Sequence, residues 1–252
     1  MNYRKNLALI ALSATALCAS ANATAQEEEA STFMLSMLEL HVKGGHDSDF
    51  RDGIKAWKEC YLENEGEGSW NMWRRLQGQG NVYVATFRMD SWADMDTADE
   101  ASQACQDVAR EKITPYTHTE KNTRALVESM PEYSRTGEQV DVVWVTNFRV
   151  SDGRMMMDVV EKVSDAITQV EGQPRGYWYN VMGGHEKAAD YFVVSPFENF
   201  AAMDVEREGV WSIVTKVHGE EEMERLRAQF MESMDAGWSY VYTRIGDLSH
   251  SQ

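Results

Sequence analysis

The chain has 252 residues, enough for one large domain or two small ones, and it carries a formal net charge of −17. A chain this acidic has no electrostatic reason to bind nucleic acid or an anionic membrane surface, which excludes both as expected partners. The simplest interpretation of the acidity is that it keeps an exported protein soluble.

The first 25 residues have the composition of a secretory signal peptide. Arg4 and Lys5 supply a basic start, an apolar run covers residues 7–19, and small residues before position 26 offer cleavage sites. The apolar run is too short to span a bilayer, which takes about 20 residues. We therefore predict a signal peptide over residues 1–25, export to the periplasm or the cell exterior, and no integral membrane segment after cleavage. Residues 26–32 then form an acidic N-terminal segment.

The first half of the mature chain begins with a predicted strand over residues 33–42 and a helix over residues 47–63. The helix carries apolar residues at i, i+4, i+7 and i+11, the spacing of a packing stripe. The residues assigned to this stripe are Phe50, Ile54, Trp57 and Tyr61. A hairpin, a helical region and a last strand should follow. The hairpin strands are predicted at residues 70–77 and 82–87. The helical region runs from residue 91 to about 127, with an interruption near Pro115, and the last strand lies at about residues 132–135.

The second half repeats this order after a linker at residues 136–140. Its strands are predicted at residues 142–150, 177–182, 190–195 and 238–245, with helical regions after the first and third. A constant offset of 108 aligns the halves from Val42 to Asp96, so that Trp70 meets Trp178. Further on, residues 128–130 match residues 232–234 at an offset of 104. We interpret the halves as two copies of one unit.

Each unit has the order β-α-β-β-α-β of a ferredoxin-like fold. Its antiparallel sheet has helices on one face only, so the other face must be buried elsewhere. The sequence therefore predicts an α+β fold, in which two tandem ferredoxin-like units pack their antiparallel sheets into one α+β barrel. The units cover residues 33–135 and 141–246, and residues 247–252 form a C-terminal tail.

The stretch His41-Val42-Lys43-Gly44-Gly45-His46-Asp47-Ser48-Asp49-Phe50 resembles a known motif. It is similar to the V-K-P-G-H/K-x-x-x-F opening of antibiotic-biosynthesis-monooxygenase-like and NIPSNAP-like domains, with Gly44 in place of proline. The second half keeps only Val150 and Gly153 of this motif. The resemblance implies a fused tandem form of the dimeric α+β barrel superfamily. That superfamily includes oxygenases, haem enzymes, isomerases and binding proteins, so the resemblance leaves the activity open.

Removal of the leader leaves two cysteines, Cys60 and Cys105. Both fall on predicted helical regions of the first unit, which lie side by side in this architecture, and an oxidising compartment would join them in a disulfide. Two separate buried thiols are an equally open alternative. No Cys/His spacing suits a metal, and we expect no metal site.

Polar residues mark one face of the first strand in each half. Glu39 and His41 correspond by the repeat to Asn147 and Arg149, and all four point between the sheets if the alternate residues pack under helices. A histidine beside a carboxylate is a candidate general base, which makes His41 and Glu39 candidate catalytic residues. Asn147 and Arg149 could hold an anionic or enolate oxygen of a ligand. The alternative is that these side chains only meet water at strand ends.

Aromatic residues are dense around the two hairpins. Alternation separates Trp70, Met72 and Arg74 from Asn71, Trp73 and Arg75. One interpretation is a pocket for a flat apolar ligand, with Trp73 and Tyr179 as contacts. The other is an ordinary core between the units, which the equivalent pair of Trp70 and Trp178 favours.

Haem is a minor alternative, because chlorite-dismutase-like proteins are also fused pairs of these units. That resemblance implies an axial histidine in the second unit and a distal arginine. The histidines available are His185, His218 and His250, and no motif of that family surrounds them.

The function predicted from the sequence is binding of a small, partly apolar molecule between the sheets. Cofactor-independent oxygenase or isomerase-type chemistry through His41 is the catalytic version of this prediction, and no cofactor is expected. The alternative is a non-catalytic structural or partner-binding protein whose barrel is filled with side chains. Cavity volume distinguishes the two. The protein is expected to be a monomer or a homodimer.

Overall fold

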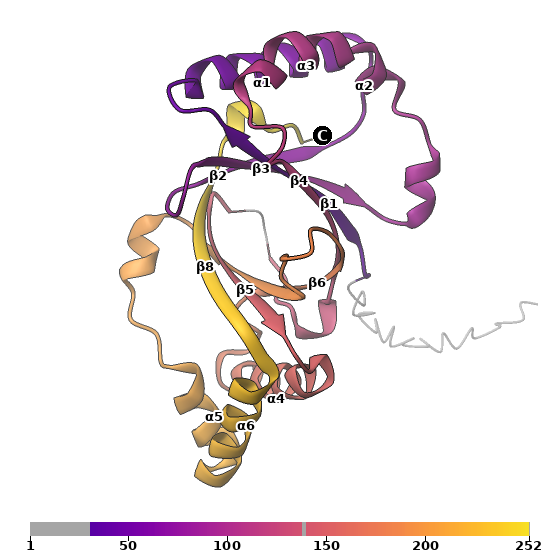
Figure 1. Ribbon diagram of the computed structural model, residues 1–252. Coiled ribbons are helices and arrows are strands. Elements are labelled where there is room, and N and C mark those ends of the chain that lie inside the picture. Colours follow the sequence, from indigo (N-terminus) through magenta and orange to yellow (C-terminus); the bar gives the residue numbers. More distant parts are fainter. Residues whose placement is uncertain (1–30, 138–139, 252) are drawn as a thin grey trace, which may run out of the picture.

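The computed structural model describes residues 31–137 and 140–251. The predicted signal peptide and residues 26–30 of the acidic segment lie outside the described residues. The described chain forms one closed barrel of eight antiparallel strands with helices outside it, which confirms the predicted fold class (Figure 1).

The barrel is built from two four-stranded sheets of the same order. The first sheet has the order β4-β1-β3-β2, from β1 (Met34–Val42), β2 (Trp70–Arg75), β3 (Asn81–Met89) and β4 (Thr123–Ser129). The second has the order β6-β7-β5-β8, from β5 (Val142–Val150), β6 (Tyr177–Gly183), β7 (Tyr191–Phe197) and β8 (Met234–Arg244). Ladders between β2 and β8 and between β4 and β6 join the sheets, so neither keeps a free edge.

Two groups of helices cover opposite sides of the barrel (Figure 1). The first group contains α1 (Asp47–Glu63), α2 (Glu100–Ala104) and α3 (Gln106–Lys112). The second contains α4 (Gly153–Glu171), α5 (Val210–His218) and α6 (Glu220–Ser233). Within the described ranges, no helix combines the length and the apolar character needed to cross a membrane.

The even-numbered residues of β1 explain which face of the first sheet is turned outward. Leu40 and Val42 are buried together with Phe50 and Ile54 of α1 in one apolar core. In the second unit, Phe148 of β5 packs in the same way against residues of α4. Because neighbouring strand residues point to opposite faces, the odd-numbered residues of β1 and β5 face the barrel interior.

The fourth strand of the first unit corrects the sequence prediction. The helical region ends with a short turn at Thr114–Tyr116, and residues 123–129 form β4 rather than the end of a helix. The strand predicted at residues 132–135 is wrong, since Pro131–Tyr133 is a 3-10 turn. Ala125, Leu126 and Glu128 are good helix formers, but pairing with both β1 and β6 overrides that propensity.

The last strand also differs from the prediction. β8 begins at Met234, four residues before the predicted start at Trp238. The proposed match of residues 128–130 with residues 232–234 is wrong, because Ser129 ends β4 whereas Ser233 ends α6. The two units therefore share their element order. Their last strands, however, do not begin at residues that the sequence match pairs with each other.

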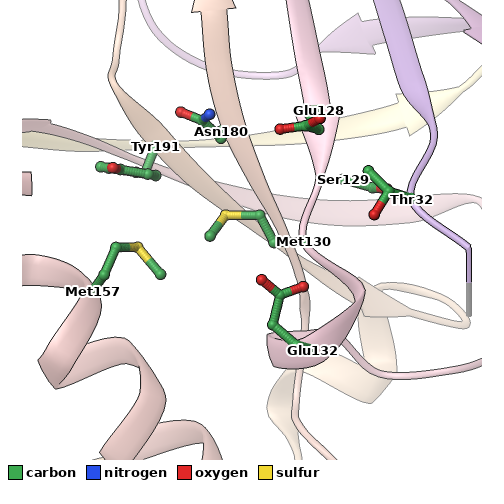
Figure 2. Close-up of a pocket in the computed structure, with 8 residues that line it drawn as sticks. All are labelled: Thr32, Glu128, Ser129, Met130, Glu132, Met157, Asn180 and Tyr191. Carbon is green, nitrogen blue, oxygen red and sulfur yellow. The ribbon is translucent and has the colours of Figure 1, made fainter. Parts of the chain in front are cut away.

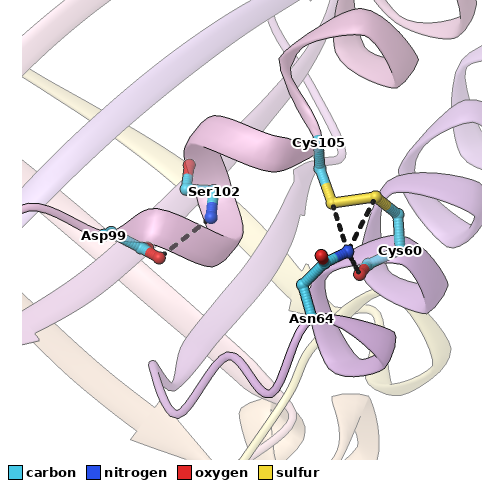
Figure 3. The surroundings of a disulfide bond; sticks show 5 residues. All are labelled: Cys60, Asn64, Asp99, Ser102 and Cys105. Carbon is cyan, nitrogen blue, oxygen red and sulfur yellow. Dashed lines mark hydrogen bonds between the residues drawn. A yellow bond between two sulfur atoms is a disulfide. The ribbon is translucent and has the colours of Figure 1, made fainter.

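A disulfide joins Cys60 of α1 to Cys105 between α2 and α3, with the Cα atoms 6.0 Å apart (Figure 3). The Asn64 side-chain amide lies 3.7 and 3.8 Å from the two sulfur atoms and donates to the Cys60 carbonyl at 2.9 Å. Asp99 caps the start of α2 by accepting the Ser102 amide N–H at 2.9 Å. The bond ties the junction of α2 and α3 to the long helix α1.

We predict that removing the disulfide destabilises the first unit. Cys60→Ala/Cys105→Ala should lower the free energy of unfolding by about 2 to 4 kcal/mol, because it releases a closed loop in the unfolded chain. Denaturant titration measures the change. Labelling of the unfolded, non-reduced mature protein should find no free thiol, and two reactive thiols would contradict the disulfide.

We also predict that neither half is stable alone. Residues 31–137 or 140–251 expressed separately would lose both inter-unit ladders and expose the apolar inner face of one sheet. Each half should show no cooperative thermal transition by circular dichroism, and mixing the halves should restore one. Independent cooperative unfolding of the two halves would refute the shared barrel.

Candidate functional site

The barrel encloses a cavity of about 920 Å³. Inward-facing residues of all eight strands line it, together with residues 120–122 before β4 and His185 and residues 187–189 between β6 and β7. Small-molecule sites commonly occupy about 300–1,000 Å³. The interior of the barrel is therefore open, and it is the candidate site.

Aromatic rings form much of the cavity wall. Tyr179 stacks on Phe192 with 4.9 Å between ring centroids and meets Phe33 edge-on at 6.3 Å. Trp73 is on the opposite part of the barrel, and its indole N–H donates to Thr86 at 3.3 Å. The structure thus places both aromatic residues expected from the sequence, Trp73 and Tyr179, in the lining. Such a wall suits a flat, apolar ligand.

Glu39 and His41 form a hydrogen-bonded pair that lines the same cavity. His41 Nε2 lies 2.8 Å from Glu39 Oε1, and both side chains are partly buried. With the proton on Nε2 donated to the carboxylate, Nδ1 is an acceptor, and it has no hydrogen-bond partner among the described residues. This is the arrangement that a general base requires.

The backbone of His41 is fixed by the loop before β4. The His41 N–H donates to Asn122 Oδ1 at 2.9 Å, and the His118 N–H donates to the His41 carbonyl at 2.7 Å. The side chain therefore projects from a strand residue held on both of its backbone groups. A positioned imidazole of this kind loses little entropy when a ligand binds.

Of the two polar residues expected at the site from the second unit, the structure places only Asn147 in the cavity lining. Asn147 lines the cavity, opposite Phe192 and Trp238. Arg149 is half-buried and pairs with Ala236 next to a register shift in the β5–β8 ladder, and it is not among the cavity residues. The assignment of Arg149 to the site is therefore corrected: it follows the same alternation, but it lies one step beyond the cavity at the irregular end of β5.

Several cavity residues were missed by the sequence prediction. Trp238, Tyr240 and Tyr242 alternate along β8 and all line the cavity. Arg75 also lines it and lies opposite Tyr242 across the β2–β8 ladder. The period-two spacing of the β8 aromatics was the available signal. Their common face could have been assigned to the interior had β8 been placed beside β2.

Burial acts on the pKa of two tyrosines of the cavity, Tyr179 and Tyr242. Burial raises the pKa of Tyr179 to about 12. Burial also raises the pKa of Tyr242, the negative charge of Glu39 adds to this rise, and the guanidinium of Arg75 opposes it. Glu39 and Arg75 thus both lie close enough to Tyr242 to act on its phenol, in opposite directions.

A second, smaller depression of about 240 Å³ lies outside the barrel (Figure 2). It is lined by residues of β4, β6, β7, α4 and the flanking segments, namely Thr32, Glu128, Ser129, Met130, Glu132, Met157, Asn180 and Tyr191. Its volume is below the range of most small-molecule sites, and no residue predicted as functional lines it. The barrel cavity is the stronger candidate.

The histidines do not fit the haem site that the resemblance implied. His185 lines the cavity from an exposed loop, where its Nδ1 accepts the Lys187 N–H at 3.0 Å. His218 lies on α5, and His250 packs against Trp70 with 5.3 Å between ring centroids. Neither of these two lines the cavity. In the part of the chain that the structure describes, no group of three or more His, Cys, Asp or Glu side chains could hold a metal ion.

Comparisons with known proteins support the fold and not a particular activity. No family model and no curated protein sequence matches the chain. A proposed monooxygenase from Lactobacillus acidophilus has a similar structure, with a TM-score of 0.51 and 10% identity over 88% of this chain and 97% of that one. A proposed chlorite dismutase gives a TM-score of 0.50 and 12% identity over 86% and 97% of the two chains. A chlorite dismutase variant from Candidatus Nitrospira defluvii gives a TM-score of 0.50 and 8% sequence identity, over 86% of this chain and 93% of that one.

We predict that Tyr179, which is half-buried, makes the protein sensitive to alkali. Its pKa is raised from 10.0 to about 12, so between these pH values the unfolded chain loses the proton while the folded chain keeps it. Stability due to this group is present below pH 10 and is lost as the pH rises toward 12. Thermal melts of Tyr179→Phe should show a smaller alkaline loss than the wild type. Tyr116→Phe, which removes a phenol outside the cavity lining, is the control and should melt like the wild type; equal losses in all three would contradict the prediction.

Proposed function

We propose that the protein binds a small, partly apolar molecule inside its barrel. The observation that carries this proposal is the open cavity of about 920 Å³ with aromatic walls. A protein whose barrel served only as a scaffold would fill this space, because an empty apolar interior forfeits packing energy. The cavity therefore favours ligand binding over the structural alternative.

The catalytic part of the proposal is proton abstraction by His41. Glu39 orients the ring and would stabilise the charge that forms when Nδ1 takes a proton. The amide of Asn147, which also lines the cavity, is available to bind an oxygen atom on which negative charge develops. Cofactor-independent oxygenase and isomerase chemistry both begin with such a step. The fold that the chain shares with a proposed monooxygenase agrees with oxygenase chemistry. The proposal itself rests on the pair of Glu39 and His41.

Export is also part of the proposed function. The composition of residues 1–25 and the Cys60–Cys105 disulfide both agree with an oxidising compartment outside the cytoplasm. Haem is not favoured as a cofactor, because His218 and His250 lie away from the cavity and His185 is on an exposed loop.

We predict that filling the cavity abolishes binding. Val145 faces the cavity, whereas the next residue, Thr146, has its hydroxyl 3.0 Å from Ser239 on the outer face of the barrel. Val145→Trp should weaken binding of the neutral fluorophore N-phenyl-1-naphthylamine by about tenfold or more, because the indole occupies the ligand's space. Thr146→Trp is the matched control and should bind like the wild type. Absence of binding to the wild type, or equal binding by both variants, would refute the proposal.

We expect His41→Ala to act on the ligand more than on the fold. Mass spectrometry under native conditions should detect a retained small molecule in the wild-type protein and less of it in the variant. The melting temperature should change little, because the imidazole is only partly buried and contacts one carboxylate. A large loss of stability with unchanged ligand retention would show that the pair is structural.

A further inference from the structure

The cavity wall has the opposite charge to the chain as a whole. The sequence has 41 acidic and 24 basic residues. The cavity lining instead contains more arginine and lysine than carboxylate. The basic residues are Arg75, Arg88, Lys121, Arg124 and Lys187, and the acidic ones are Glu39 and Glu120. Positive charge is therefore concentrated at the cavity of an acidic protein, where the low dielectric of the walls strengthens its field.

Histidines already engage both carboxylates of the lining. Glu39 Oε1 lies 2.8 Å from His41 Nε2, and Glu120 Oε1 lies 3.2 Å from His118 Nδ1. Arg88 has Asp90 as its partner at 3.2 Å. Over residues 31–137 and 140–251, no ion pair involves the four remaining cations, Arg75, Lys121, Arg124 and Lys187. The lining therefore keeps an excess of positive charge, five basic residues against two acidic ones.

Arg75 is the cation that the fold holds most firmly at the cavity. Its guanidinium lies over the ring of Tyr240, 4.5 Å from the centroid, and donates to the Gln79 carbonyl. Its Nε is buried and has no hydrogen-bond partner among the described residues. A half-buried guanidinium without a carboxylate is unfavourable unless a further acceptor reaches it. Nε itself is closed off from the cavity, but Arg75 lines it, so an anionic group of a ligand would pair with the part of the guanidinium that faces the interior.

We propose that the ligand of the barrel is a flat, apolar molecule that carries a carboxylate or a similar oxyanion, and that Arg75 binds this anionic group. The inference rests on the proposed function, since it requires an occupied cavity. Arg75 and Trp73 point into the cavity from the same strand, two residues apart, so one ligand can meet both. A guanidinium binds a carboxylate through two parallel hydrogen bonds, and the rings of Trp73 and Tyr240 accept the flat part.

The other unpaired cations lie on or beside two loops of the cavity. Lys121 precedes β4 and Lys187 lies between β6 and β7, and both side chains are exposed. Exposed charges of this kind raise the rate at which an anion enters, and salt screens them. Arg75 then supplies the specific contact inside the barrel.

The test compares two ligands of the same shape and different charge. 2-Naphthoate is an anion, and 2-naphthamide is its neutral isostere. Isothermal titration of the wild-type protein at neutral pH should show naphthoate binding about tenfold or more tightly than naphthamide, because a charge-assisted hydrogen bond is stronger than a neutral one. Arg75→Gln should remove this preference by weakening naphthoate alone.

Arg74→Gln is the matched control, because Arg74 is the neighbouring residue on the outer face. Its guanidinium lies 3.7 Å from Asp47 and 5.8 Å from the centroid of the Tyr83 ring. This variant should keep the preference for naphthoate. Should Arg75→Gln fail to fold, Arg75→Lys tests the same contact: lysine keeps the charge but loses the two parallel hydrogen bonds, so the preference for naphthoate should shrink.

The outcomes separate this inference from the proposed function. Equal binding of both naphthalenes, lost in Val145→Trp, would overturn the anionic ligand and leave the binding cavity standing. A preference for naphthoate that persists in folded Arg75→Gln would overturn the role of Arg75. Failure of both naphthalenes and of N-phenyl-1-naphthylamine to bind the wild type would overturn the proposed function itself.

Discussion

The architecture depends on one constraint: both faces of each sheet are apolar, and helices cover only one of them. Helices cover one face, where Leu40 and Val42 pack with Phe50 in the first unit and Phe148 packs with Met156 in the second. The other face is also rich in apolar side chains and cannot remain in water. Pairing of β2 with β8 and of β4 with β6 closes both inner faces around one interior and removes every strand edge. The cavity is the consequence of this closure, because eight strands leave room for a small ligand between their side chains.

The polar residues of the interior obey the same constraint. A carboxylate inside a barrel is expensive unless it is paired, and Glu39 meets this requirement through His41 at 2.8 Å. Arg75 has no carboxylate partner among the described residues and is held by the Tyr240 ring, one backbone carbonyl and a hydrogen bond to the Tyr242 hydroxyl. In a closed apolar core, such a residue would be selected against. At the wall of an open cavity, the charge of its guanidinium can instead bind an anionic group of a ligand.

Local patterns were sufficient to predict the face of each first strand. The switch of β1 from apolar to polar at Glu39 and His41 identified the inward residues, and alternation around Trp73 did the same for β2. What the sequence could not show is how the two sheets meet. Strand alternation assigns both Arg75 and Arg149 to the inner face of their sheets. The β2–β8 ladder places Arg75 opposite Tyr242 in the cavity, whereas a register shift beside Arg149 leaves that residue outside the lining. β4 was hidden for a different reason, since its residues favour a helix until two neighbouring strands pair with them.

Because both sheets belong to one chain, the barrel can be asymmetric. β4 and β8 are the last strands of their units and lie on opposite sides of the barrel order. β4 contributes the small side chains of Thr123, Ala125 and Val127, whereas β8 contributes Trp238, Tyr240 and Tyr242. Two identical subunits would have to place the same side chains on both walls, either filling the interior with rings or leaving it without them. Here β8 carries rings where β4 carries small side chains, so the two sides of the interior differ and favour one orientation of a bound ligand. That orientation decides which of its atoms His41 can reach.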